Sequence, residues 1–366
     1  MIQTLNAAAL RAYIFSDTFD QAPVLPISRH RALSHLANPR LRPDDVIMIF
    51  AHSDEGELVG YLGVLPDEIY LNGKQDRGGW LSCMWVNPIT RGQGIGGKLV
   101  QAALNAWQGR ILVTEFTPAA KRLYDRTEAF VDLHQPVGLR GFLRFDTAKV
   151  LPPKKPIFQQ IKPLLQLADA GGNLIHDLRL GFKSYKPALK WEYVDNLDEQ
   201  LVGLLEGRQE GQVFRRGAAE INWVLQNPWV LSGADQDDYS RRYHFSAVDK
   251  RFDFVLLRLY RQDAELAGWM MLSIRNRHLK VPFLYVDDDL LPEATKLLYL
   301  HMLQMKLNMI SVFHPKLVET IKASSHPFFH LRELRRHYII GKQFADDLVA
   351  HGSVVIQDGD ADCAFT

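Results

Sequence analysis

The sequence predicts an α/β (α+β) fold in which mostly antiparallel sheet is flanked by helices, repeated in two tandem domains. The first observation is a pair of apolar runs, residues 46–51 and 58–65, separated by a charged turn around Gly56, which is typical of an antiparallel hairpin. The second is the mixture of helical and strand-like segments that follows. The third is that the C-terminal half repeats this order of elements without repeating the residues. The 366 residues, 47% hydrophobic and 23% charged, are enough to bury two cores.

The first half divides at its turn and capping residues. Thr117 and Pro118 are typical of an N-cap and of the first residue of a helix, which we expect to run to residue 128. The expected elements are a helix at 29–37, the two hairpin strands, a strand at 80–86, a helix at 96–107, a strand at 111–115, the helix after Thr117 and a strand at 137–145.

A proline-rich stretch separates the halves. Pro152, Pro153 and Pro156 favour a linker, because proline interrupts both helices and sheet ladders. We expect an amphipathic segment at 158–168 and a second helix after Gly171 and Gly172. The predicted domains are residues 1–147, a linker with a helical segment at 148–190, and residues 191–366. The second half is expected to contain a helix at 218–226, strands at 252–260, 265–274 and 279–286, a helix at 291–306, a strand at 309–313, a helix at 315–323 and a strand at 337–340.

Composition excludes several classes of protein. Lys plus Arg (43) and Asp plus Glu (42) leave a net charge of +1, so we expect no nucleic-acid partner. Cys83 and Cys363 cannot form a disulfide framework or a zinc site, and the scattered histidines predict no metal. The N-terminus lacks a basic n-region, and no apolar run could span a bilayer, so we expect a cytoplasmic protein without a membrane partner.

The most informative segment is the glycine cluster at residues 87–100, NPITRGQGIGGKLV. Glycines let successive backbone N–H groups turn inward, and a helix that starts there adds the positive end of its dipole. Lys98 falls in the first turn, where a cation opposes the dipole unless an anion compensates. The segment therefore predicts a binding site for a pyrophosphate.

The cluster fits two kinds of cofactor site. The pattern Gly92-x-Gly94-x-x-Gly97 satisfies the dinucleotide fingerprint, and Glu115 has the spacing of its ribose-binding acid. However, in that fold the strand runs directly into the first glycine. Here Pro88 ends the strand early and the upstream segments form an antiparallel meander, so an NAD-binding protein remains only an alternative.

The pattern Arg91-x-x-Gly94-x-Gly96 resembles the acyl-CoA pyrophosphate loop of the GNAT acetyltransferase superfamily. A strand ending in Val-x-Pro precedes it, and Ala120-x-x-Leu123-Tyr124 follows on the next helix but one. The resemblance covers residues 1–147 in element order and is specific over 80–130. It implies a mixed GNAT-type sheet with acetyl-CoA bound beside the fourth strand. The second half lacks such a loop, since Asp287, Asp288 and Asp289 occupy that place, so it would be a GNAT-like domain that binds no cofactor.

The resemblance also implies site residues. Backbone groups of the fourth strand would align the pantetheine, and the loop N–H groups would hold the pyrophosphate. The expected cofactor-binding residues are Cys83, Met84, Trp85, Val86, Arg91, Gly92, Gln93, Gly94, Ile95, Gly96, Gly97, Lys98 and Thr117, the last standing where the family commonly has Asn. Tyr124 matches the tyrosine that often acts as general acid toward the coenzyme A sulfur, and a buried aromatic is the alternative.

No general base is evident on the fourth strand. Glu115 is the nearest ionisable candidate, although a solvated residue at a strand end is an equally good interpretation. Cys83 has no neighbouring His in the sequence, so it is not favoured as a nucleophile. The tail has Asp358, Asp360 and Asp362 in alternation, which we interpret as a polar tail capped by a phenylalanine.

The sequence thus predicts an N-acetyltransferase that moves an acetyl group from acetyl-CoA to a primary amine of a small acceptor by direct attack. A homodimer is compatible with it. A first alternative is an acyl-CoA-binding or regulatory module with little turnover. Aminoacyl transfer from charged tRNA is another, ranked lower because proteins of that kind do not depend on an intact coenzyme A loop.

Overall fold

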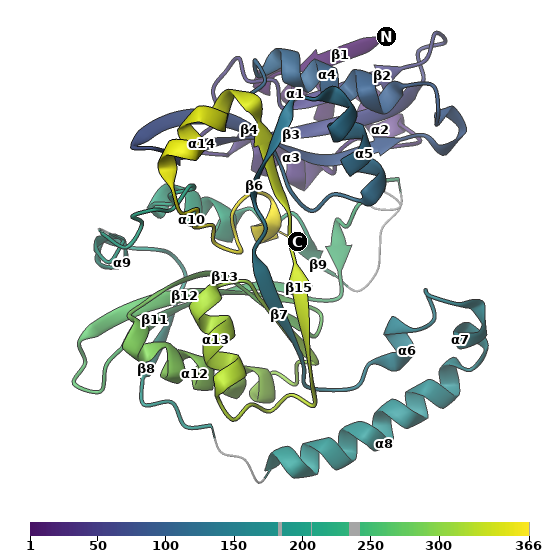
Figure 1. The fold of residues 1–366 in the computed structure, drawn as a ribbon. Helices are drawn as coiled ribbons and strands as arrows, with labels where there is room; N and C mark the ends of the chain where they lie inside the picture. Colours follow the sequence, from purple (N-terminus) through teal and green to yellow (C-terminus); the bar gives the residue numbers. More distant parts are fainter. Residues whose placement is uncertain (182–184, 206, 234–241, 366) are drawn as a thin grey trace. The chain divides into compact units, whose positions relative to one another are not determined.

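Two seven-stranded sheets organise the chain in the computed structural model, which describes residues 1–181, 185–205, 207–233 and 242–365 (Figure 1). The first sheet contains, in spatial order, β1 (Ile2–Leu5), β2 (Met48–His52), β3 (Leu58–Leu71), β4 (Lys74–Val86), β5 (Ile111–Val113), β16 (Tyr338–Gly341) and β6 (Phe130–His134). The second contains β15 (His330–Arg335), β7 (Val137–Phe142), β14 (Met309–Val312), β13 (His278–Val286), β12 (Leu266–Arg275), β11 (Phe252–Tyr260) and β8 (Lys190–Val194).

The two sheets have the same plan. In each, one parallel pair (β4 with β5, β13 with β14) is embedded among antiparallel neighbours. The predicted α/β class with mixed, mostly antiparallel sheets in tandem is therefore confirmed. Each half also gives one strand to the other half's sheet, because β7 lies between β14 and β15 and β16 lies between β5 and β6.

This exchange changes the grouping of residues. One compact unit contains residues 1–136, 195–252 and 336–366, and the other contains residues 137–194 and 253–335. We call them unit 1 and unit 2. The sequence predicted contiguous domains at 1–147 and 191–366; the units interleave because strand pairing joins segments that lie some 200 residues apart, and hydrophobic pattern alone does not specify such partners.

Most predicted helices are present with small shifts. The helices are α1 (Ala7–Ile14), α2 (Asp17–Gln21), α3 (Arg29–Leu36), α4 (Ile95–Ala106), α5 (Pro118–Thr127), α6 (Thr147–Val150), α7 (Pro156–Gln160), α8 (Lys162–Gly181), α9 (Glu199–Gly203), α10 (Ala218–Gln226), α12 (Leu291–Gln304), α13 (Pro315–Ala323) and α14 (Ala345–His351). Contrary to the expectation of two segments, Gly171 and Gly172 lie inside the single helix α8. Among the described residues, no helix combines the length and hydropathy needed to cross a membrane.

Helices cover both faces of the first sheet. Successive residues of β2 point to opposite faces, so Ile49 packs with Leu99 and Val100 of α4, whereas Met48 and Phe50 pack with α1 and α3. The helices packed on both faces of the sheet hold β4, β5 and the start of α4 in place. These three elements form the candidate site.

Candidate active site

A cavity of about 540 Å³ opens in unit 1 where β4 and β5 diverge. The two parallel strands pair only at Gly79 with Ile111 and Trp80 with Leu112. Beyond that point residues 81–86 of β4 and residues 113–117, from the last residue of β5 onward, line the cavity instead of pairing with each other. An extended ligand could therefore bond to this edge of β4.

An irregularity in β4 shapes this edge. The register between β3 and β4 shifts between Tyr61 and Gly63, and Cys83 has a φ of +53°, in the left-handed region. Such a bulge bends a strand and re-aims its groups, and bulges are common next to active sites. Cys83, Met84, Trp85 and Val86 all line the cavity, as predicted for the residues along the pantetheine.

The glycine loop leads directly into α4. Gly92 (φ +89°) and Gly94 (φ +76°) adopt left-handed conformations that L side chains rarely adopt, and Gly94 is the N-cap. Gly94 offers no side chain to cap the first turn, so the N–H groups of that turn face outward with the positive end of the helix dipole. This arrangement fits a pyrophosphate.

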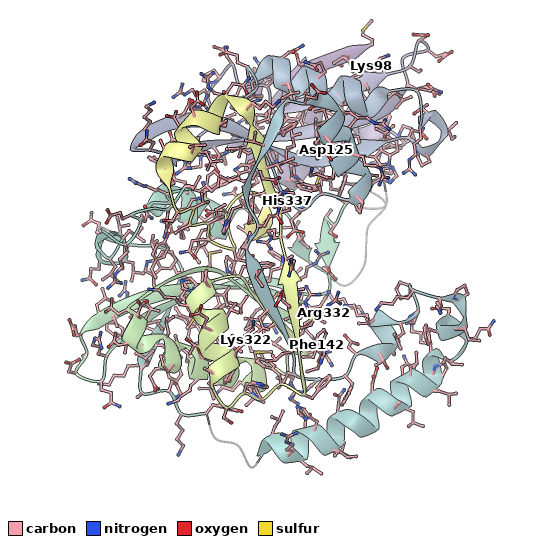
Figure 2. All side chains as sticks on the ribbon, in the orientation of Figure 1. Lys98, Asp125, Phe142, Lys322, Arg332 and His337 are labelled. Carbon is pink, nitrogen blue, oxygen red and sulfur yellow. The ribbon has the colours of Figure 1, made fainter. Side chains whose placement is uncertain are left out.

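Residues of the glycine loop and of the first turn of α4 line two neighbouring cavities. Arg91 and Gly96 line the main cavity, and Gly97 follows in the first turn of α4. Gln93, Ile95 and Lys98 line a second cavity of about 560 Å³ beside the loop. Lys98 lies on α4, as labelled in Figure 2.

Helix α5 supplies the opposite wall of the main cavity. Thr117 accepts a hydrogen bond from the N–H of Ala120 (3.2 Å), so its hydroxyl acts as the predicted N-cap. Tyr124 lines the cavity, is only 4% exposed and packs edge-on against Phe116 and Phe130. Burial, together with the charge of Asp362, raises the pKa of Tyr124 above its ordinary value, so the phenol keeps its proton at neutral pH.

Glu115 also lines the cavity but is engaged elsewhere. Its Oε1 accepts a hydrogen bond of 2.6 Å from Nε of Arg336, which lies just before β16. Arg336 is buried and also binds Asp358 (2.6 Å), so the carboxylate of Glu115 belongs to a charged cluster at the cavity rim. The oxygen of Glu115 that is bonded to Arg336 is therefore already occupied by a hydrogen-bond donor.

The C-terminal tail, which the sequence led us to interpret as a polar tail capped by a phenylalanine, is largely buried. Its three alternating acids each have a partner: Asp358 binds Arg336, Asp360 binds Arg216 (3.1 Å) and Asp362 accepts a hydrogen bond from Ser82 (2.5 Å). Phe365 is fully buried and stacks on Trp229 at 4.3 Å between ring centroids. The three acids thus lie in a run of turns that leads into a short 3₁₀ helix, Cys363–Phe365, packed inside unit 1.

This tail places Asp362 in the main cavity. Asp362 lines it together with Tyr124 and Glu115. Burial raises the pKa of Asp362, the charge of Glu115 raises it further, and the hydrogen bond from Ser82 and the charge of Arg31 oppose the rise. A carboxylate beside a cavity with a pKa above its ordinary value is suited to accept a proton near neutral pH.

A buried arginine supports the same group of side chains. Arg31 of α3 donates hydrogen bonds to Ser82 (2.7 Å), Cys83 Sγ (2.5 Å) and Tyr243 (3.0 Å), and its guanidinium lies 3.8 Å from the ring centre of Trp229. Ser82 thus bridges Arg31 and Asp362. Cys83 accepts a hydrogen bond from the guanidinium of Arg31, and that it is not a nucleophile stays a prediction.

Asp362, Ser82 and Arg31 were not predicted from the sequence as site residues. They come from three segments far apart in the chain. Only Asp362 had a visible signal in the sequence, the alternation of acids in the tail.

In unit 2, the acidic turn at Asp287–Asp289 forms ion pairs with Arg261 and Lys316 and provides no anion cradle. Among the described residues, no group of His, Cys, Asp and Glu is arranged to hold a metal ion.

Comparison with known proteins agrees with this geometry. Residues 44–127 match the family model described as an acetyltransferase (GNAT) domain. The first half of the chain contains a GNAT domain. The match includes β2 to β5, the glycine loop, α4 and α5, which are the elements around the main cavity. No curated protein matches the sequence.

Solved structures extend the likeness to both halves. A GCN5-related N-acetyltransferase from Anabaena variabilis is similar with a TM-score of 0.50 and 11% identity, over 92% of this chain and 72% of that chain. An N-myristoyltransferase from Saccharomyces cerevisiae, with bound myristoyl-CoA, is similar with a TM-score of 0.50 and 9% identity, over 93% of this chain and 78% of that chain. At these identities the likeness concerns the fold, which continues beyond the GNAT domain through the second sheet.

Proposed function

We propose that the protein is an N-acetyltransferase that uses acetyl-CoA to acylate a primary amine of a small acceptor. The observation that carries the proposal is the convergence of four features on one cavity of unit 1: the unpaired edge of β4, the loop residues Arg91 and Gly96, the phenol of Tyr124 and the carboxylate of Asp362. The GNAT domain supplies the expected cofactor class.

The residues present fit an acyl-CoA. The uncapped first turn of α4 would hold the pyrophosphate, with Gly92 and Gly94 providing the backbone shape. Backbone groups of residues 83–86 would bond along the pantetheine arm, because β5 leaves that edge unpaired. The bound thioester supplies an activated acetyl group. The chain must then orient the acceptor, remove one proton from its amine and protonate the departing sulfur.

Two side chains suit these proton transfers. As the amine nitrogen bonds to the acetyl carbon and the carbon–sulfur bond breaks, Asp362 takes the proton from nitrogen and Tyr124 gives its proton to the sulfur. Asp362 replaces Glu115 in this role because Glu115 is bonded to Arg336. The raised pKa values of both groups match their roles, since the acid must arrive protonated and the base must hold the proton it accepts.

The experiment is Tyr124→Phe, measured by release of free coenzyme A thiol from acetyl-CoA over a panel of primary amines. We expect kcat to fall by about 10²-fold or more while the affinity for acetyl-CoA changes little, because the phenol acts only on the leaving group. Tyr13→Phe is the matched control, since Tyr13 is a partly buried tyrosine of unit 1 that does not line the cavity. Equal activity of the two variants would exclude Tyr124 as the acid. Acetyl-CoA binding without turnover of any amine would favour the regulatory alternative.

A further inference from the structure

Helix α8 of unit 2 turns its polar side inward. Asp169 accepts hydrogen bonds from the N–H of Thr147 (3.0 Å) and Ala148 (2.9 Å), and Asn173 exchanges two hydrogen bonds with the backbone of Phe145. The next turn continues this face, because Asp177 binds Arg144 at 2.8 Å and Leu180 is buried. The helix is therefore held to its own unit by polar contacts, and Figure 1 shows it as a long helix beside α6 and α7.

The opposite side of α8 is apolar and exposed. At 3.6 residues per turn its apolar residues fall on one side of the helix and so form one stripe along it. The stripe and the preceding turn contain Ile157, Leu164, Leu167, Leu174, Ile175 and Leu178, each between 55% and 72% exposed. Helices of globular proteins normally bury their apolar side, so a stripe of this length marks a binding surface.

Cations surround this stripe. Residues 147–181 contain five Lys or Arg and two Asp, a net charge of 5 − 2 = +3, whereas the whole chain has +1. Both acids, Asp169 and Asp177, are bonded on the packed side. The exposed cations are Lys149, Lys154, Lys155, Lys162 and Arg179. Asp177 is 45% exposed but is paired with Arg144, so the surface of α8 combines apolar side chains with an excess of positive charge.

We propose that this surface, residues 149–179, binds the surface of an anionic lipid bilayer. Apolar side chains of an interfacial helix enter the boundary between headgroups and acyl chains, and flanking lysines attract anionic headgroups. The sequence predicted no membrane partner because no apolar run could span a bilayer, but surface binding needs no span.

Charge decides between this ligand and a second copy of the chain. If two α8 helices paired antiparallel, Lys162 of one would approach Arg179 of the other, and a parallel pair would bring Lys162 beside Lys162. Like charges would repel in both arrangements. Anionic lipid headgroups instead complement the excess of positive charge on this surface.

The test is co-sedimentation of the full chain with phosphatidylcholine vesicles, with and without about a third phosphatidylglycerol. We expect binding that needs the anionic lipid and weakens with salt. Leu167→Glu/Leu174→Glu should weaken it at least tenfold, and Lys154→Gln/Lys155→Gln/Lys162→Gln should weaken it by up to about a hundredfold, at about fivefold per lysine. The matched control is Phe15→Glu/Val349→Glu, which places the same charges on exposed apolar residues of unit 1 and should bind as the wild type does.

Two further measurements distinguish a loss of vesicle binding from unfolding and from self-association. Circular dichroism shows whether the variants retain helix, which we expect because the altered side chains are exposed. Light scattering reports self-association. Wild-type protein that ignores anionic vesicles, or a Leu167→Glu/Leu174→Glu variant that binds them as well as the control does, overturns the proposal. A dimer that this double variant dissociates, without vesicle binding, assigns the stripe to a second copy instead.

Discussion

At the scale of single residues, the chemistry of the site depends on how Asp362 is held. Its carboxylate meets four influences: burial and the charge of Glu115 raise its pKa, while the hydrogen bond from Ser82 and the charge of Arg31 lower it. Ser82 is a shared partner, since it donates to Asp362 and accepts from Arg31. The proton affinity of the proposed base is therefore set by its burial and by Glu115, Ser82 and Arg31.

This arrangement predicts the pH profile. Because Asp362 must be ionised to accept a proton, kcat/KM should rise with pH through a pKa above the ordinary aspartate value. Ser82→Ala removes a hydrogen bond that favours the ionised form, so it should move this rise to higher pH while leaving activity at alkaline pH largely intact. Asp362→Asn should lower kcat/KM by about 10²- to 10⁴-fold and abolish the rise.

Two further results of the pH profile test whether Asp362 acts as the base. Asp362→Glu should recover part of the activity, since it restores a carboxylate near the same place. An unchanged pH profile in Asp362→Asn would remove Asp362 from the mechanism and return Glu115 to consideration.

At the scale of elements, the tail is both a structural and a functional segment. Asp360 is buried beside Arg216, which also binds Asp67, and burial raises the pKa of Asp360 from 3.8 to about 6. A raised pKa in the folded state means that the stabilising contribution is fully present below about pH 4, where the group is protonated in both states. That contribution is lost as pH rises through about 6.

Asp360→Asn tests this behaviour, because Asn stays neutral at every pH. Between pH 4 and pH 7 the free energy of unfolding of the wild type should fall relative to that of Asp360→Asn by on the order of 3 kcal/mol, from a shift of about two units. Urea titrations at several pH values measure the difference. A difference that stays flat over this range would show that Asp360 titrates as it does in the unfolded chain.

Local sequence patterns predict some elements of this fold, but not which strands pair with one another. The glycine loop, α4 and α5 follow local rules, such as Gly94 at a left-handed N-cap and Thr117 with Pro118 at a helix start, and all three were predicted. β16 was predicted as a strand, but not its place between β5 and β6. Its partners depend on three-dimensional packing of distant segments, on which the local pattern carries no information.

The candidate site likewise contains residues that the local sequence predicts and one, Asp362, that it does not. The predicted cofactor residues 83–86, Arg91, Gly96 and Thr117 line one cavity with Tyr124, because they belong to neighbouring elements of one short segment. Asp362 reaches that cavity from the far end of the chain, through a tail whose burial depends on Phe365 and on partners such as Arg216. The sequence was interpreted as a polar tail capped by a phenylalanine; in the fold, each of its three acids has a specific partner.

At the scale of the whole molecule, the same sheet plan occurs twice, but within the part of the chain that the structure describes only unit 1 has a glycine loop suited to a phosphate. The place of the loop in the second half is the turn at Asp287–Asp289, whose acids pair with Arg261 and Lys316. An acidic turn repels a pyrophosphate. We therefore expect the duplicated fold to bind one acyl-CoA per chain, in unit 1.

Titration calorimetry of the full chain with acetyl-CoA tests this claim most directly, with NAD as the comparison ligand. We predict one acetyl-CoA site per chain, no binding of NAD, and at least tenfold weaker binding of acetyl-CoA by Gly94→Val, because a β-branched residue disfavours the φ of +76° that shapes the loop. Gly73→Val, at φ +71° in the turn between β3 and β4, carries the same backbone strain away from the loop and should bind as the wild type does. Two sites per chain, equal losses in both variants, or binding of NAD in place of acetyl-CoA would contradict the account.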